Sequence, residues 1–167
     1  MTAETIATLL TGHVVLGAVF LALAEKFLPM APSSAMFILL GMKTVAGLGD
    51  LAVMLAATTI GSSLGCLCLY ALGRSLGEGR CAAFVARYGP YILLSPARYD
   101  GLVRGYRRHH FQVTLFGQTI PNARAYLPVP AGIFGMAPGR FLLAILLGTS
   151  IWNGGFLTLG YIMRVGA

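Results

Sequence analysis

The sequence predicts an all-α integral membrane protein with three or more transmembrane helices and two re-entrant hairpins. Three observations lead to this fold class: an apolar composition, long uncharged segments, and two apolar segments broken by proline. Hydrophobic residues make up 57% of the 167 residues and charged residues only 10%, against about 25% charged in an ordinary soluble domain. A small soluble domain with this composition would expose too much apolar surface to water, because a small domain is mostly surface.

Three uncharged segments have the length of about 20 residues that a bilayer-spanning helix needs. They are residues 5–24, 51–72 and 141–163, and they are the predicted spans. Between the second and third spans, Pro96 is placed to start a further helix, because proline is favoured at the first helical position. The basic segment that follows, 97–110, is predicted to lie along the membrane interface.

The positive charge is concentrated in one part of the chain. The net charge is +7, and residues 74–108 hold seven arginines with only Glu78 and Asp100 as acids. The positive-inside rule therefore predicts that residues 73–110 form a cytoplasmic basic loop. Tyrosines interleave with these arginines and would also suit base stacking. In so apolar a chain, contacts with lipid headgroups are the better explanation, and no nucleic-acid partner is expected.

Two further apolar segments, 27–42 and 111–139, are interrupted by prolines and cannot span as regular helices. Hydrocarbon does not tolerate unpaired backbone, so such segments must be buried in protein or line a watery cavity. Both are predicted to be re-entrant hairpins, and each carries a Gly-Met pair, at 41–42 and 135–136. Paired segments of this kind point to a transporter site between repeats. The structural residues of the hairpins are Pro29, Pro32, Pro121, Pro128, Pro130 and Gly132.

Two charged residues in or beside these segments are the main site candidates. Arg124 lies in an apolar stretch, where a charge at bilayer depth costs about 2.5–3.5 kcal/mol. A watery hairpin would lower that cost and a bound anion would offset it; the alternative is an arginine that reaches to the interface. Glu25 lies where the first span meets the first hairpin. It is either a proton carrier or half of an interfacial pair with Lys26, and the sequence leaves both open.

Motifs of enzymes and cofactor-binding proteins are missing from the sequence. There is no serine, histidine and acid arrangement in a hydrolase context, no HExxH and no phosphate-binding P-loop. The three cysteines have neither metal-binding nor redox spacing. The sequence therefore predicts no enzyme, no cofactor and no metal site.

Several stretches together resemble the DedA family, the bacterial relatives of the VTT-domain (SNARE-associated Golgi) proteins. Glu25 followed by prolines resembles the family's first hairpin, and residues 70–77 resemble its Y-x-x-G-R-x-x-G pattern. Residues 116–136 are similar to its second hairpin, in which an F-x-R-x-x-P-x-x-R core leads to P-x-P-A-G-x-x-x-M. The resemblance covers roughly residues 20–163.

The resemblance implies an inverted-repeat membrane protein with two facing re-entrant hairpins, located in the bacterial inner (plasma) membrane as a multi-pass protein. Family members are implicated in moving phospholipids or polyprenyl-phosphate carriers across the bilayer, often coupled to protons. Their site comprises two acids in the first hairpin and two arginines in the second. Glu25 matches the first acid and Arg124 the second arginine. Gln118 stands in place of the first arginine, and Ser34-Ala35 in place of the second acid.

Together, these features predict a DedA-like transporter or flippase for a lipid with an anionic phosphate headgroup. Arg124 would bind the phosphate with Gln118 and Asn122 as hydrogen-bond partners, and Glu25 would be the counter-charge or the proton carrier. One rival is a non-transporting membrane scaffold that supports envelope integrity or assembly. A second is a membrane enzyme acting on lipid phosphates, for which the sequence offers no nucleophile or metal cluster. Whether the chain forms a homo-oligomer stays open.

Overall fold

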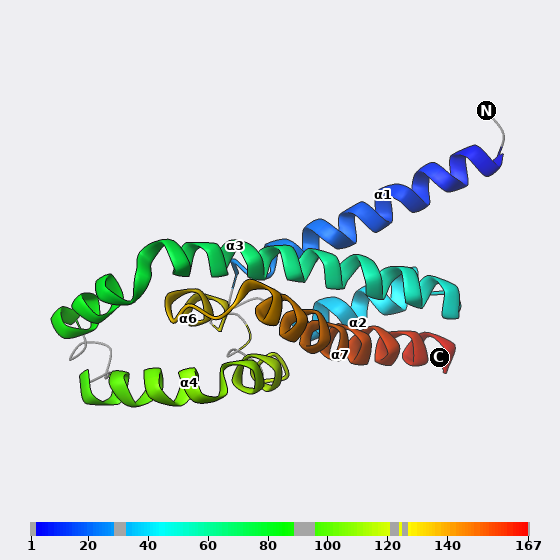
Figure 1. Ribbon diagram of the computed structural model, residues 1–167. Helices are drawn as coiled ribbons and strands as arrows, with labels where there is room; N and C mark the ends of the chain where they lie inside the picture. Colours follow the sequence, from blue (N-terminus) through cyan, green and yellow to red (C-terminus); the bar gives the residue numbers. More distant parts are fainter. Residues whose placement is uncertain (1–2, 29–32, 89–95, 121–123, 125–126, 167) are drawn as a thin grey trace. The chain divides into compact units, whose positions relative to one another are not determined.

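The computed structural model of the chain is helical (Figure 1). The residues that it describes are 3–28, 33–88, 96–120, 124 and 127–166. Every regular element in these ranges is a helix, which confirms the predicted all-α class. The chain divides into two compact units, one made of Met1–Gly65 with Leu146–Ala167 and the other of Cys66–Ile145. Each unit is described in turn.

The first unit contains two whole helices and parts of two longer ones. The whole helices are α1 (Ala3–Ala24) and α2 (Ser33–Thr44), and the longer helices are α3 (Leu48–Tyr88) and α7 (Pro138–Val165). The first part of α3 and the last part of α7 belong to this unit. Its core is formed by seven side chains from all four helices and the link after α2: Ala18, Ala22, Phe37, Val45, Met54, Ala57 and Leu157.

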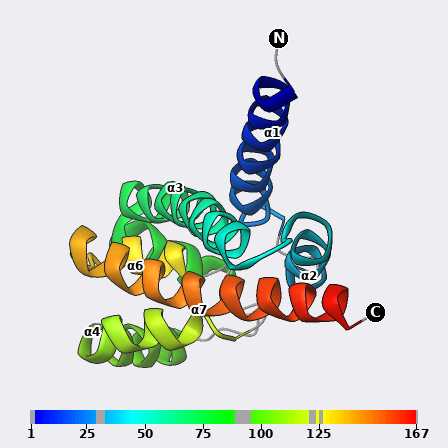
Figure 2. The same cartoon turned by 90° about the vertical axis from the view of Figure 1, so that its right-hand side faces the viewer.

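Within this unit, α2 and α7 meet backbone to backbone through two glycines (Figure 2). A Cβ atom added at Gly41 would overlap the carbonyl oxygen of Leu157, and one added at Gly160 would overlap the carbonyl oxygen of Ile38. Each glycine thus faces the backbone of the other helix. Small residues allow such close approach of helices in lipid, where packing rather than the hydrophobic effect drives association.

The second unit contains the rest of α3, the helices α4 (Pro96–Gly117) and α6 (Pro128–Ile133), and the start of α7. Here α6 meets α3 in the same reciprocal manner. A Cβ atom at Gly132 would overlap the carbonyl oxygen of Tyr70, and one at Gly73 would overlap that of Val129. The spacing is the same in both units. Gly160 lies three residues after Leu157, whose carbonyl Gly41 faces, and Gly73 lies three residues after Tyr70, whose carbonyl Gly132 faces.

Among the described residues, two helices are long and apolar enough to cross a membrane, Leu48–Arg80 and Pro138–Val165. They contain the predicted spans 51–72 and 141–163. The predicted first span, 5–24, lies in α1, in which the described residues include a shorter apolar helix, Gly12–Ala24.

Most of the described residues in the predicted cytoplasmic loop, 73–110, are helical. Beyond residue 72, α3 continues to Tyr88, with a break at Gly77, whose φ of 72° lies in the left-handed region that favours glycine. The predicted helix start at Pro96 is confirmed. However, α4 does not end at residue 110 but continues to Gly117 through a break at His109, so the first residues of the predicted second hairpin belong to α4.

Candidate functional site

The first unit buries an ion pair in the turn that follows α1. The Lys26 Nζ atom lies 3.0 Å from the Glu25 Oε1 atom, and both side chains are almost fully buried. Glu25 and Lys26 therefore form a pair, one of the two alternatives that the sequence left open for Glu25, but the pair is buried and not exposed to water. Burial of two charges is costly unless they are paired, and this pairing of neighbouring residues meets that requirement locally.

Side chains from α3 and α7 extend this pair into a polar network. Ser62 Oγ donates to Glu25 Oε1 at 3.5 Å, and Asn153 Nδ2 donates to Ser62 Oγ at 3.3 Å. The Oδ1 atom of Asn153 is buried and accepts no hydrogen bond from the residues that the structure describes. Ser62 was not predicted to have a function, since a serine among small residues in a span is typical of helix packing. Its link to Glu25 depends on how α1 and α3 meet.

The close approach of α1 and α3 explains why Lys26 is buried. A Cβ atom at Gly65 would lie 2.8 Å from Lys26 Cγ and 2.9 Å from the Leu23 carbonyl oxygen. Glycine at this position leaves space for the lysine stem against α3. The ammonium group can donate three hydrogen bonds, and among the described residues its one polar partner is Glu25.

The second unit buries the two described members of the predicted phosphate site. Arg124 is 4% exposed and Gln118 is fully buried. Gln118 Nε2 donates to the backbone oxygen of Arg124 at 3.5 Å, whereas Gln118 Oε1 is buried and has no hydrogen-bond partner among the described residues. The Arg124 side chain therefore does not extend to an exposed surface of the described structure. The structure brings Gln118 and Arg124 together, and Asn122 lies outside the described residues.

Of the structural hairpin residues, three are described. Pro128 is the first residue of α6, where its missing N–H costs nothing, and Pro130 lies in the same helix. Gly132 packs against α3, as described above. Pro29, Pro32 and Pro121 lie outside the described residues.

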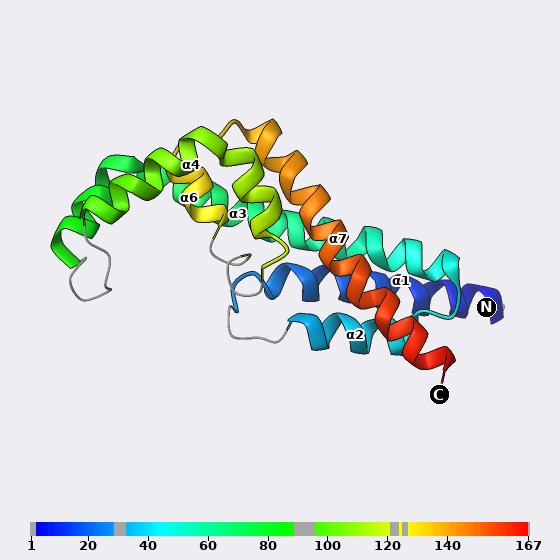
Figure 3. The ribbon, with the colours of Figure 1, turned by 90° about the horizontal axis from the view of Figure 1, so that it is seen from below.

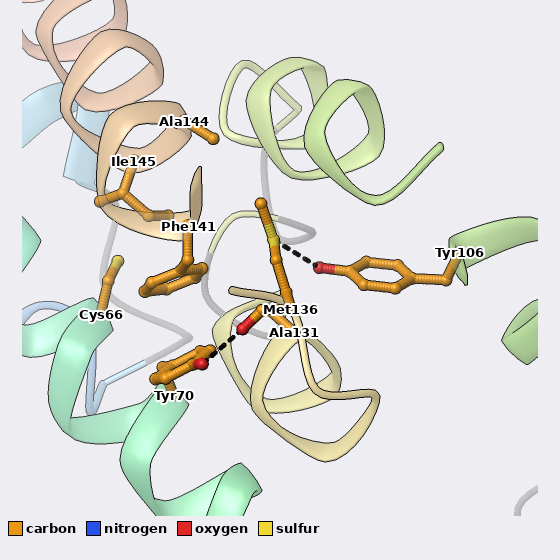
Figure 4. Close-up of a cluster of buried hydrophobic side chains, with 8 residues drawn as sticks. All are labelled: Cys66, Tyr70, Tyr106, Ala131, Met136, Phe141, Ala144 and Ile145. Atoms are coloured by element: carbon orange, nitrogen blue, oxygen red, sulfur yellow. Dashed lines mark hydrogen bonds between the residues drawn. The ribbon is translucent and has the colours of Figure 1, made fainter. Parts of the chain in front are cut away.

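Met136, near the end of the predicted second hairpin, makes polar contacts with α3 and α4 (Figure 4). Its backbone oxygen accepts a hydrogen bond of 2.5 Å from the Tyr70 hydroxyl. Its sulfur lies 3.6 Å from both the Tyr106 hydroxyl and Thr114 Oγ1. Tyr70 also stacks on Phe141 with ring centroids 4.4 Å apart. The family pattern contains Tyr70 and Met136, but nothing in the sequence linked Tyr106 or Thr114 to them.

The Tyr106 hydroxyl is a neutral hydrogen-bonding group. Burial, together with the nearby Tyr70, raises its pKa to about 12, although the 2.7 Å hydrogen bond with Thr114 acts in the opposite direction. The hydroxyl therefore keeps its proton at neutral pH. Arg74 joins the same cluster, since its Nη1 atom donates to the Tyr70 hydroxyl at 2.9 Å.

The long apolar helices fit a helical membrane protein, in which buried ionisable side chains are rare and mark functional sites. Residues 28–162 match the VTT domain. The chain therefore belongs to the VTT-domain family, and the DedA resemblance of the sequence is confirmed.

Curated relatives are bacterial proteins of this family. The chain is 35% identical to an alkaline phosphatase-like protein of Lactococcus lactis subsp. cremoris over 86% of this chain and 68% of the relative. It is 29% identical to undecaprenyl phosphate transporter A of Staphylococcus aureus (84% and 69%) and 28% identical to inner membrane protein YqjA of Escherichia coli K12 (87% and 64%). The chain thus spans about two thirds of these relatives. No solved structure matches it.

Proposed function

We propose that this chain is a membrane transporter that moves a lipid with a phosphate headgroup, of the polyprenyl phosphate class, across the bilayer. The observation that carries the proposal is the burial of Arg124 beside Gln118 in the second unit. A relative named undecaprenyl phosphate transporter A supports the same substrate class.

Arg124 is suited to phosphate because its guanidinium offers a planar fork of donors that can bind two oxygens at once. Gln118 supplies a further donor, Nε2, which in this structure bonds to the Arg124 backbone oxygen. Gln118 replaces a family arginine, so this site has one positive charge fewer and relies more on hydrogen bonding. Asn122 completes the proposed set.

Glu25 acts in this proposal as a counter-charge rather than as a proton carrier. The Lys26 ammonium lies 3.0 Å from its carboxylate and already neutralises it inside the protein, which is the role that a carried proton would have. The absence of the second family acid, replaced by Ser34-Ala35, agrees with transport that does not depend on protons at this site.

We also propose that 27–42 and 111–139 are re-entrant hairpins in an inverted repeat. The support is the matching geometry of the two units: α2 meets α7 through Gly41 and Gly160, and α6 meets α3 through Gly132 and Gly73, with the same spacing. We place this arrangement in the bacterial plasma membrane as a multi-pass protein, and a relative named inner membrane protein YqjA supports the choice of membrane.

The test is reconstitution of the full chain in liposomes that contain a fluorescent short-chain polyprenyl phosphate. Wild type should translocate the lipid, Arg124→Lys should do so more slowly because it lacks the fork of donors, and Arg124→Ala should be nearly inactive. Arg104→Ala is the matched control, since Arg104 is exposed on α4. Equal rates for wild type and Arg124→Ala, at equal amounts of folded protein, would refute the phosphate-binding role.

The same assay separates the rival functions. A scaffold would leave the lipid in its original leaflet with every variant. An enzyme would release a dephosphorylated lipid, which chromatography of the liposome extract detects. The name alkaline phosphatase-like belongs to the Lactococcus relative, and among the residues described for this chain no group of three histidines, cysteines or acids is placed to hold a metal.

A further inference from the structure

A basic pocket lies on the second unit, between the break in α4 and the first turn of α7. Its volume is about 270 Å³. It is lined by Arg108, His109, His110, Phe111, Gln112 and Arg140. None of these residues belongs to the proposed transport site around Arg124.

The break in α4 builds this pocket. Successive side chains on a regular helix point about 100° apart, so five consecutive residues would cover all sides of it. Here all five residues from 108 to 112 line one hollow. They can do so because His109 has φ −133° and ψ 30°, outside the helical region. Figure 3 shows the resulting bend of α4.

In the described part of the chain, no acid balances the charge of the pocket. Arg108 and Arg140 are exposed, and the ion pairs among the described residues are Lys26–Glu25 and Arg107–Glu78. Neither pocket arginine therefore has an acidic partner in the described part of the chain. Arg140 lies in the first turn of α7, where the helix dipole adds partial positive charge.

We propose that this pocket binds a phosphate ester or free phosphate. Arg108 and Arg140 come from two helices and can each offer a fork of donors to the phosphate oxygens. Phe111 gives the pocket an apolar wall beside these cations, which suits a phosphate attached to a hydrocarbon chain. The proposal concerns binding alone and does not depend on transport.

The experiment uses a fluorescent reporter inside the pocket of the full chain in detergent. Gln112 is exposed and lines the pocket, so Gln112→Trp reports binding there against the constant background of Trp152. The reporter is placed in an Arg124→Ala background, which removes the proposed transport site. Three probes are titrated: a ten-carbon isoprenyl phosphate, the matching alcohol and inorganic phosphate.

A saturable fluorescence change with at least one of the two phosphate probes is expected, and a weaker one or none with the alcohol. Arg108→Gln and Arg140→Gln should each weaken binding about tenfold, as for loss of one charge-assisted contact. Arg104→Gln, on the same helix but outside the pocket, should change it less than about twofold. Lysine at either pocket position should give intermediate affinity, which separates lost charge from lost folding.

The probes distinguish the source of the phosphate. Tighter binding of the isoprenyl phosphate than of inorganic phosphate assigns the pocket to a lipid headgroup, and equal or tighter binding of inorganic phosphate assigns it to the free ion. The proposal is overturned if neither phosphate probe saturates, if the alcohol binds as tightly, or if both glutamine variants bind like the parent. Because Arg124 is already replaced, none of these results depends on transport.

Discussion

Replacement of Lys26 by methionine tests whether the buried ion pair holds the first unit together. Lys26→Met keeps the length and apolar stem of the side chain but removes the ammonium that lies 3.0 Å from the Glu25 carboxylate. The carboxylate side chain is only 3% exposed, so water cannot replace the lost partner without rearrangement. Ser62 remains as a weaker partner at 3.5 Å.

The expected loss of stability is large. Removal of one partner from a buried ion pair typically costs about 3–5 kcal/mol. For a chain of this size that corresponds to a decrease in Tm of roughly 6–20 °C. The double variant Glu25→Gln/Lys26→Met removes both charges at similar volume, and buried pairs replaced together are often neutral. It should therefore lie within about 1 kcal/mol of wild type.

The assay is equilibrium unfolding of four proteins in the same mixed micelles: wild type, each single variant and the double variant. A double-mutant cycle then isolates the coupling between the two side chains. The expected coupling is about 3 kcal/mol or more. A coupling below about 0.5 kcal/mol, the level seen for many exposed pairs, would refute the conclusion that the pair is buried in the folded protein.

Three further predictions concern packing, pH and topology. Gly132→Ala should destabilise the protein by about 1–3 kcal/mol, because a Cβ atom there meets backbone that cannot move aside. Gly105→Ala, which meets nothing within 4 Å, should be neutral or stabilising in the same melts. Stability should fall as pH rises from about 10 towards about 12, because the folded state keeps the Tyr106 proton up to a pKa of about 12. Tyr106→Phe should flatten this pH dependence. A cysteine replacing Gly79, exposed in the arginine-rich segment, should react with membrane-impermeant reagents only from the cytoplasmic side; labelling from outside alone would reverse the topology.

The sequence predicted the helical class and the start of α4 because both depend on local properties. Composition and the length of uncharged runs select helices in a bilayer, and proline at residue 96 favours a first helical turn. The polar extension of α3 to Tyr88 was not predicted, since hydropathy marks where a span ends and not where a helix ends. The break at His109 has no evident signal in the sequence either.

The glycine contacts between α2 and α7 and between α6 and α3 could not be predicted from the sequence pattern alone. The sequence pairs the Gly-Met at 41–42 with the Gly-Met at 135–136, yet in the structure it is Gly132 that matches the contact of Gly41. A Cβ atom added at Gly135 would meet nothing within 4 Å, and Gly135 instead lies in a turn with a φ of 69°. Which glycine faces a neighbouring backbone depends on the rotation of each helix about its axis, and this is fixed only when two helices pack.

Some features of the candidate site were likewise predictable from local sequence, whereas others depended on the tertiary structure. By itself, the sequence determined that Arg124 and Glu25 are charges in or beside apolar segments, and the neighbouring Lys26 made an ion pair available. Only the tertiary structure decided that this pair is buried and linked to Asn153 through Ser62, residues 91 positions apart in the chain. Burial is a property of surfaces brought together from distant segments, so no local pattern of residues can specify it.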